Sequence, residues 1–185
     1  MAHHHPPMDL LLEYAAGALP VAQSACVAAH LSYCQRCRQV VDNLEDVGGA
    51  HLERLDPQPV GESVLESVMA RLDDPEPLRY APNEVSDTQL PGLLDRLING
   101  NYADLAWKRV TQSLSISYLK TGDPNHEFAL YRIAEGGRIP EHTHGGSEMT
   151  LVLRGGFADE SGEYHPGDFL VSCLLYTSDA ADDVA

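Results

Sequence analysis

Basic residues are scarce in this sequence. It has 12 Lys and Arg residues against 28 Asp and Glu residues, which gives a formal net charge of −16 over 185 residues. Because contacts to phosphates need clustered Lys and Arg, this composition argues against direct binding of nucleic acid. An acidic surface suits a basic protein partner, such as a DNA-binding protein, and it also promotes solubility. Charge alone does not choose between these two roles.

Long apolar runs are also missing. No stretch reaches the length of a membrane span, and the opening residues MAHHHPPMD lack the basic segment and apolar core of a signal peptide. The expected location is therefore the cytoplasm. Cysteines are few, and four of them in a reducing compartment favour metal or redox chemistry over disulfides. Apolar residues make up 43% of the chain, which is enough for a packed core in one domain or two small ones.

The spacing of one imidazole and two thiols predicts a metal site near the start of the chain. His30 comes four residues before Cys34, and Cys34 and Cys37 lie about one helical turn apart. Both sulfurs face one point if a helix begins there, and His30 can close on them across a short turn. Thiolates with imidazole favour Zn²⁺, which takes four ligands in a structural site. The alternative is an ordinary pair of helices with two free thiols.

Two residues are candidates for the fourth ligand. His5 precedes the first apolar helical pattern and is able to fold back onto the site, whereas Cys26 lies four residues before His30, on the same face of a helix. Each also has a simpler interpretation. His5 ends a histidine run typical of a disordered start or a tag, and Cys26 can be a small buried apolar residue. Spacing alone leaves the choice open.

Helical spacing of apolar residues predicts an N-terminal helical domain over residues 1–72. The four helical stretches are residues 8–19, 20–31, 34–55 and 61–72. The pair Gly48-Gly49 is able to interrupt or end the third stretch. A unit of this size holds a thin core and gains stability from a bound metal. The fourth stretch has a clear apolar stripe, which either packs on the first three helices or grips a partner.

The composition changes after residue 72. Residues 73–88 are rich in Pro and acidic residues, which is typical of a linker. Residues 89–172 contain short β-forming stretches separated by turn residues, which indicates a sandwich or barrel. The predicted fold class is therefore α+β. Trp107 is the single tryptophan of the chain and is expected to anchor the second core.

A second group of possible metal ligands lies in this β half. His142 and His144 alternate on one strand, so both imidazoles project to the same face, and Glu148 returns a carboxylate toward them after a Gly-Gly turn. Two histidines and one carboxylate suit a divalent metal such as Zn, Fe, Mn or Ni. The alternative is a solvated histidine pair in an exposed turn.

Both halves of the chain resemble known families. The pattern from Gly136 to Gly155 is similar to the first motif of the cupins. The run HLSYCQRC, preceded by YAAGAL, is similar to the zinc-binding domain of the ChrR-type anti-sigma factors. This second resemblance extends over residues 5–172. In that family a histidine just before the first helix is the fourth zinc ligand, which implies the set His5, His30, Cys34 and Cys37 and leaves Cys26 in the core.

The resemblance also implies a function. The helices of such a protein hold an extracytoplasmic-function-type sigma factor away from RNA polymerase, and the cupin half senses an oxidative stress, singlet oxygen or organic peroxide, and triggers release. It implies structural zinc in the first site and a second divalent metal, Zn²⁺ by expectation, in the cupin site. Such a regulator of transcription is not an enzyme, and it contacts neither nucleic acid nor membrane directly. The alternatives are a dioxygenase-like cupin metalloenzyme with a helical appendage, or an oligomerisation module joined to a small-molecule-binding barrel.

The cupin pattern breaks down near the end of the sequence. Gly167-Asp168 matches the turn of the second cupin motif, but no histidine follows it. A barrel also needs closing strands, because otherwise it exposes unpaired edges. We therefore expect a truncated cupin barrel and a tail over residues 173–185 that is not native, derived from vector, adaptor or a frameshift. The second metal site then has three ligands at most.

Overall fold

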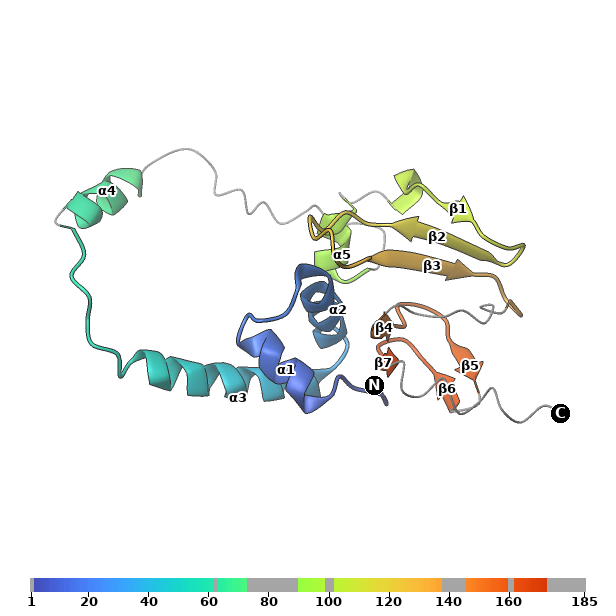
Figure 1. The fold of residues 1–185 in the computed structure, drawn as a ribbon, viewed down its shortest axis with the longest axis horizontal. Coiled ribbons are helices and arrows are strands. Elements are labelled where there is room, and N and C mark those ends of the chain that lie inside the picture. Colours follow the sequence, from blue (N-terminus) through green and yellow to red (C-terminus); the bar gives the residue numbers. More distant parts are fainter. Residues whose placement is uncertain are drawn as a thin grey trace.

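The computed structural model describes residues 2–61, 63–72, 90–98, 102–137, 146–159 and 162–172. Helices form the first part of the chain and strands the second (Figure 1), which confirms the predicted α+β class. The predicted linker and tail lie outside the described residues, so the domain boundaries stay predictions. Among the described helices, none is both long enough and apolar enough to cross a membrane.

The four helical stretches predicted from apolar spacing are all present. They are α1 (Met8–Ala15), α2 (Val21–Leu31), α3 (Gln35–Leu52) and α4 (Ser63–Arg71). α1 ends four residues earlier than the apolar pattern because Gly17 adopts a φ of 67°, and the N–H groups of Gly17 and Ala18 bond back to Tyr14 and Glu13. α3 continues through Gly48 and Gly49, so the glycine pair does not end the helix.

The β half begins with short helical segments that the sequence pattern does not predict. α5 (Gly92–Leu97) and the 3-10 helix η1 (Tyr102–Asp104) precede the strands, and their six and three residues are too few to show a helical period. Trp107 follows η1 and is half-buried beside the three-stranded sheet. The Arg132 guanidinium lies 4.2 Å from the centre of its ring.

Within the described residues, seven short strands form three antiparallel sheets. The strands are β1 (Lys108–Arg109), β2 (Leu114–Tyr118), β3 (Ala129–Ile133), β4 (Glu148–Leu151), β5 (Phe157–Asp159), β6 (Gly162–Tyr164) and β7 (Phe169–Ser172). Their order is β1-β2-β3 in the first sheet, and β4 with β7 and β5 with β6 in the other two. Strands that follow one another in the chain pair as hairpins in the first and third of these sheets, as expected for an all-β half. β7 pairs with β4 along its whole length, from Phe169 to Ser172.

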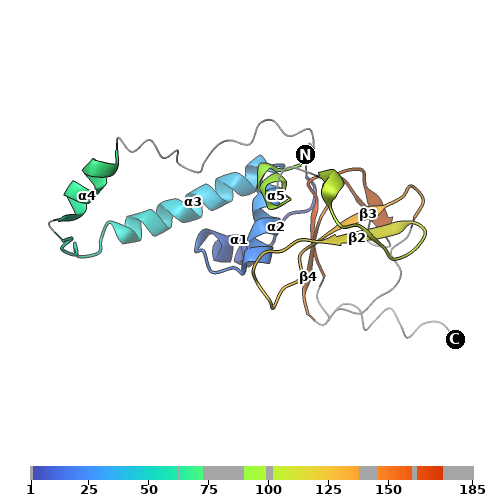
Figure 2. The same ribbon diagram turned by 90° about the horizontal axis from the view of Figure 1, so that it is seen from above.

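One apolar core joins the helices to the β half. Val27 of α2 and Val41 of α3 are buried in the same cluster as Phe169 of β7, which is only 2% exposed. Met149 and Leu151 of β4 pack against this cluster. α2 also contacts α5 and β4 directly, and Figure 2 shows α2 beside α5. The turn between α2 and α3 is consequently held between helical and β elements.

α4 and the distal part of α3 lie apart from that core (Figures 1 and 2). α4 has no buried residue, and the buried residues of α3, Cys37 and Val41, are both in its first half. The large apolar side chains left exposed in this region are Val47, Leu52, Leu55, Val60, Val64, Leu65, Val68, Met69 and Leu72. The described contacts therefore do not include packing of the fourth helix on the first three.

Candidate metal centre

The turn between α2 and α3 brings three of the predicted ligands together. After α2 ends, the N–H groups of Tyr33 and Cys34 donate to the carbonyl of His30 at 2.8 and 3.1 Å. Cys34 is the N-cap residue of α3, and its sulfur accepts a hydrogen bond from the N–H of Cys37 at 3.4 Å. The helix start that the spacing requires is therefore present.

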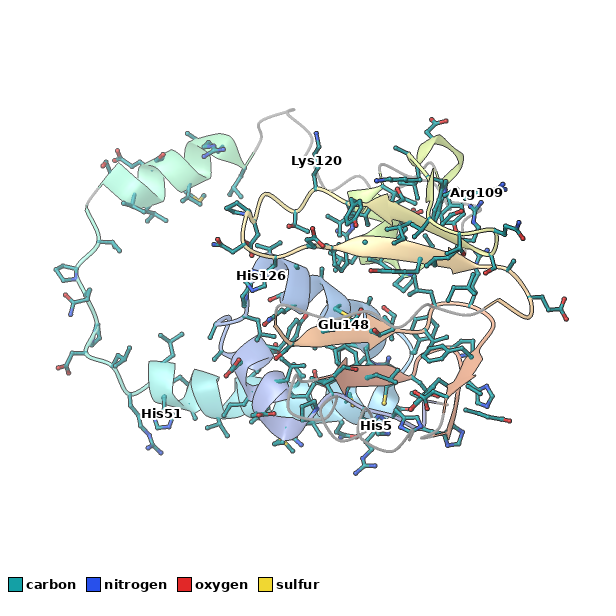
Figure 3. The ribbon with its side chains drawn as sticks, turned by 45° about the vertical axis from the view of Figure 1, so that its right-hand side comes forward. His5, His51, Arg109, Lys120, His126 and Glu148 are labelled. Carbon is teal, nitrogen blue, oxygen red and sulfur yellow. The ribbon has the colours of Figure 1, made fainter. Side chains whose placement is uncertain are left out.

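His5 completes the cluster from the N-terminal arm, which we define as residues 2–7 (Figure 3). Its Nδ1 lies 3.4 Å from Sγ of Cys34 and 3.5 Å from Sγ of Cys37. With His30, these residues place one ligand atom each within 4.8 Å of one another. Cys26 is buried in the same apolar core as Cys34 and Cys37, but it is not part of this group of ligands.

The geometry of the cluster suits tetrahedral zinc. Bonds of about 2.3 Å to sulfur and about 2.1 Å to nitrogen put two ligand atoms of a tetrahedral site about 3.6 Å apart. The distances from Nδ1 of His5 to the two sulfurs, 3.4 and 3.5 Å, are close to this value. Four protein ligands leave no open position for a substrate, so the chemistry available to such an ion is structural.

The buried imidazole of His30 is oriented toward the cluster by a carbonyl of the β half. His30 is 0% exposed, and its Nδ1 lies 2.7 Å from the carbonyl oxygen of Gly167. A carbonyl only accepts, so Nδ1 carries the proton and Nε2 keeps its lone pair. Nε2 is buried and has no hydrogen-bond partner in the part of the chain that the structure describes. A buried polar atom is costly when left unpaired, and a metal ion at the cluster satisfies it.

The Asp168 carboxylate fixes the N-terminal arm. Its Oδ1 accepts from the N–H groups of His3 and His4 at 2.5 and 3.0 Å, and its Oδ2 accepts from the N–H of His165 at 2.8 Å. Burial by itself raises the pKa of Asp168, but the N–H donors of His4, His165 and His3 outweigh it and lower the pKa to about 2. The carboxylate is therefore charged at neutral pH and holds the arm in place.

Burial separates the protonation states of the metal-free ligands. It lowers the pKa of His5, with a further contribution from the charge of Arg36, and it lowers the pKa of His30 against the opposing hydrogen bond to Gly167. Burial, reinforced by the hydrogen bond to Cys34, raises the pKa of Cys37 to about 12. At neutral pH the histidines are thus ready to bind a cation, whereas the Cys37 thiol must first lose its proton.

Zinc uptake at pH 7 is expected to release about one proton or more per ion, because Cys37 binds as a thiolate. Since zinc binds only the deprotonated form, the apparent affinity should rise steadily from pH 6 to pH 8.5, well below the pKa of about 12. Calorimetry in buffers of different ionisation enthalpy measures the released protons. Zinc uptake without proton release at pH 7 would contradict this protonation scheme.

The predicted cupin metal site lies only partly within the described structure. His142 and His144 fall outside the described residues, so the site and its metal stay predictions. Glu148 is half-buried at the start of β4, where it pairs with Ser172 of β7 (Figure 3). After burial, the charge of Glu148 is the next largest cause of the raised pKa of Tyr131.

No local sequence pattern indicates that the turn at Gly167 and Asp168 contributes to the first cluster. These residues match a cupin turn, and 137 positions separate Gly167 from His30, so no local spacing connects them. The one available signal is that the turn keeps its glycine and acidic residue although the histidine of the cupin motif is missing. The contact between Gly167 and His30 becomes visible only where β7 packs against α2.

A family model, a relative and a solved structure that match this chain all concern ChrR proteins. The family model described as the ChrR cupin-like domain matches residues 96–177. The anti-sigma-E factor ChrR of Cereibacter sphaeroides is 37% identical over 169 residues, which cover 91% of this chain and 78% of that protein. The crystal structure of Rhodobacter sphaeroides SigE in complex with the anti-sigma ChrR matches with a TM-score of 0.79 and 35% identity, over 94% of this chain and 88% of the matched chain.

Proposed function

This chain belongs to the ChrR family of anti-sigma factors, and from this premise we propose that it sequesters an extracytoplasmic-function-type sigma factor of RNA polymerase. Members of this family are binding regulators and not enzymes, which speaks against a dioxygenase-like cupin. In our proposal the zinc-stabilised helices hold the sigma factor. The cupin-like half receives an oxidative signal, singlet oxygen or an organic peroxide, and the sigma factor is then released.

The uncovered apolar side of α4 carries this proposal. The helix has nine residues and none of them is buried. Leu65 is 69% exposed and Met69, four residues later on the same face, is 56% exposed. An isolated helix of this length is marginal in water, and its amphipathic pattern is stabilised by burial of the apolar face. A partner with an apolar groove offers that burial.

The charge of the chain supports a basic partner. The formal net charge is −16, whereas a sigma factor presents basic surface to DNA. Complementary charge speeds encounter and disfavours wrong partners, while the apolar contacts of the helices supply most of the affinity. Both properties fit a protein that competes with polymerase for a sigma factor.

Zinc in the first cluster stabilises the helices that we propose hold the sigma factor. His5, His30, Cys34 and Cys37 come from the N-terminal arm, the end of α2 and the start of α3, and one ion bound by all four holds these segments in a fixed arrangement. In the cupin-like half, His142, His144 and Glu148 are the residues that we propose for a second divalent metal. Its open coordination positions suit a sensor that meets small reactive molecules.

A binding experiment with SigE of Rhodobacter sphaeroides tests the proposal. The zinc-loaded full chain is expected to form a stable one-to-one complex in size-exclusion chromatography and to block transcription by polymerase carrying SigE. Singlet oxygen from an illuminated photosensitiser is expected to release SigE, whereas the same mixture in the dark stays assembled. A zinc-loaded chain that neither elutes with SigE nor inhibits transcription would count against sequestration, and an intact complex after illumination would count against singlet oxygen as the signal.

A further inference from the structure

The ligands of the zinc cluster are oriented from two different parts of the chain. Cys34 and Cys37 are positioned by the start of α3, within the helical part. The two histidines depend on the β half. The carbonyl of Gly167 orients His30, and the carboxylate of Asp168 holds the arm that ends in the ligand His5.

We propose that the turn at Gly167 and Asp168 forms the outer coordination sphere of the zinc site, so that the β half sets how tightly the helical part holds its metal. This inference rests on the zinc site of the proposed function and adds two positioning residues to it. Partners of this kind fix the orientation and tautomer of metal-bound histidines, and their loss weakens metal binding about 10–100-fold.

Gly167 makes a close approach that a larger residue does not permit. Its φ is +95°, and a Cβ built on it lies 2.8 Å from Cβ of Tyr33, in the turn between α2 and α3. The contact is reinforced on both sides. The Gly167 N–H donates to the carbonyl of Val152 at 2.8 Å, and the Tyr33 hydroxyl donates to the carbonyl of Leu153 at 3.2 Å. The carbonyl that orients His30 therefore has little freedom to move.

Asp168 acts on the other histidine through the backbone of the arm. The side chain is 0% exposed, and two of its three N–H donors, those of His3 and His4, belong to the arm. The Phe169 N–H adds a hydrogen bond to the carbonyl of His4 at 3.1 Å. An N-terminal segment without such anchors samples many conformations, so fixing it before metal binding removes much of the entropy cost of bringing His5 to the ion.

This arrangement gives the β half a route to the zinc site. β7 begins directly after the turn, and it pairs with β4, which starts at the proposed cupin ligand Glu148. A change that shifts β7 moves the turn, and the two histidines lose their supports while the cysteines keep theirs. Linkage is reciprocal, so zinc binding in turn stabilises the docking of the β half on α2.

Asp168→Asn in the full chain tests the proposal, with Asp123→Asn as the matched control. Asp123 is also a carboxylate of the β half that accepts hydrogen bonds, from the Asn125 N–H at 2.9 Å and from Nδ1 of His126 at 2.7 Å, but it lies in the loop between β2 and β3. Zinc affinity is measured by competition with a chromophoric chelator. We expect Asp168→Asn to weaken zinc binding about 10–100-fold, and Asp123→Asn to leave it unchanged.

A double-mutant cycle separates positioning from general loss of structure. If Asp168 acts through the arm, Asp168→Asn adds little to the loss already caused by His5→Ala, whereas destabilisation of the β half adds in full. His4→Pro removes one N–H donor to Asp168 from the arm and leaves the sequence of the β half intact. It is expected to weaken zinc binding in the same direction, also in the case that Asp168→Asn does not fold. Cobalt absorption then reports whether an imidazole ligand is lost.

The outcomes distinguish this inference from the zinc site itself. A wild-type chain that binds no zinc refutes the site, and unchanged affinity in His5→Ala refutes that ligand. Suppose that the wild type binds zinc and that His5→Ala weakens the binding. Wild-type zinc affinity in a folded Asp168→Asn variant then overturns the outer-sphere role. If Asp168→Asn does not fold, wild-type zinc affinity in His4→Pro overturns it. Full additivity in the cycle also overturns it.

Discussion

Replacing Cys37 with alanine is expected to abolish zinc binding and the sigma complex together, whereas Cys26→Ala leaves both intact. The two thiols are a matched pair, since they are 3% and 7% exposed and burial raises the pKa of each to about 12. Of these two cysteines, Cys37 alone places its sulfur beside Nδ1 of His5. A structural zinc ion that loses one of its four ligands is incompletely coordinated. The free energy that zinc binding contributes to folding is then lost.

Zinc content and complex formation are read from the same samples. Metal analysis of the purified proteins is expected to give about one zinc per chain less for Cys37→Ala than for Cys26→Ala, whatever metal the proposed cupin site holds. Size-exclusion chromatography with SigE then shows whether the complex follows the metal. Full zinc content in Cys37→Ala would contradict the ligand assignment, and a full complex without zinc would contradict the structural role of the ion.

Val68→Asp is expected to weaken sigma binding on the order of 100-fold, because it removes an apolar contact and places a carboxylate in an apolar interface at a cost of roughly 3 kcal/mol. Val110→Asp is the matched control. The two valines are 53% and 50% exposed, but Val68 lies on α4 and Val110 next to β1 in the β half. The control should therefore bind SigE as the wild type does.

Surface-based kinetics give the two dissociation constants, and zinc content is measured alongside. Zinc binding should be unaffected in both variants, since neither valine belongs to the metal cluster. Equal affinity of Val68→Asp and the wild type would show that α4 is not part of the sigma-binding surface. Equal loss in both variants would show that added negative charge, and not the apolar face of α4, weakens the complex.

Local patterns were enough to predict the helical part. The helical repeat that predicts these segments includes Leu11, Ala25 and Val41, and these residues are buried in the structure. The motif from His30 to Cys37 is short enough for backbone geometry to bring its ligands together. α5 has six residues, which are too few to show a helical period, so the sequence does not predict it. The apolar pattern of the fourth helix fits both packing and partner binding, and the structure shows no buried residue on it.

The α+β class, the helix start at Cys34 and the chemistry of a zinc site can all be predicted from local pattern, because each depends on residues a few positions apart. The residues that support that site become visible only in the folded chain. His5 reaches the cluster because Asp168 holds the arm, and His30 is oriented by Gly167, across 137 positions of chain. Such contacts depend on how β7 packs on α2. That packing is set by the shape of the shared core around Phe169, which no sequence period encodes.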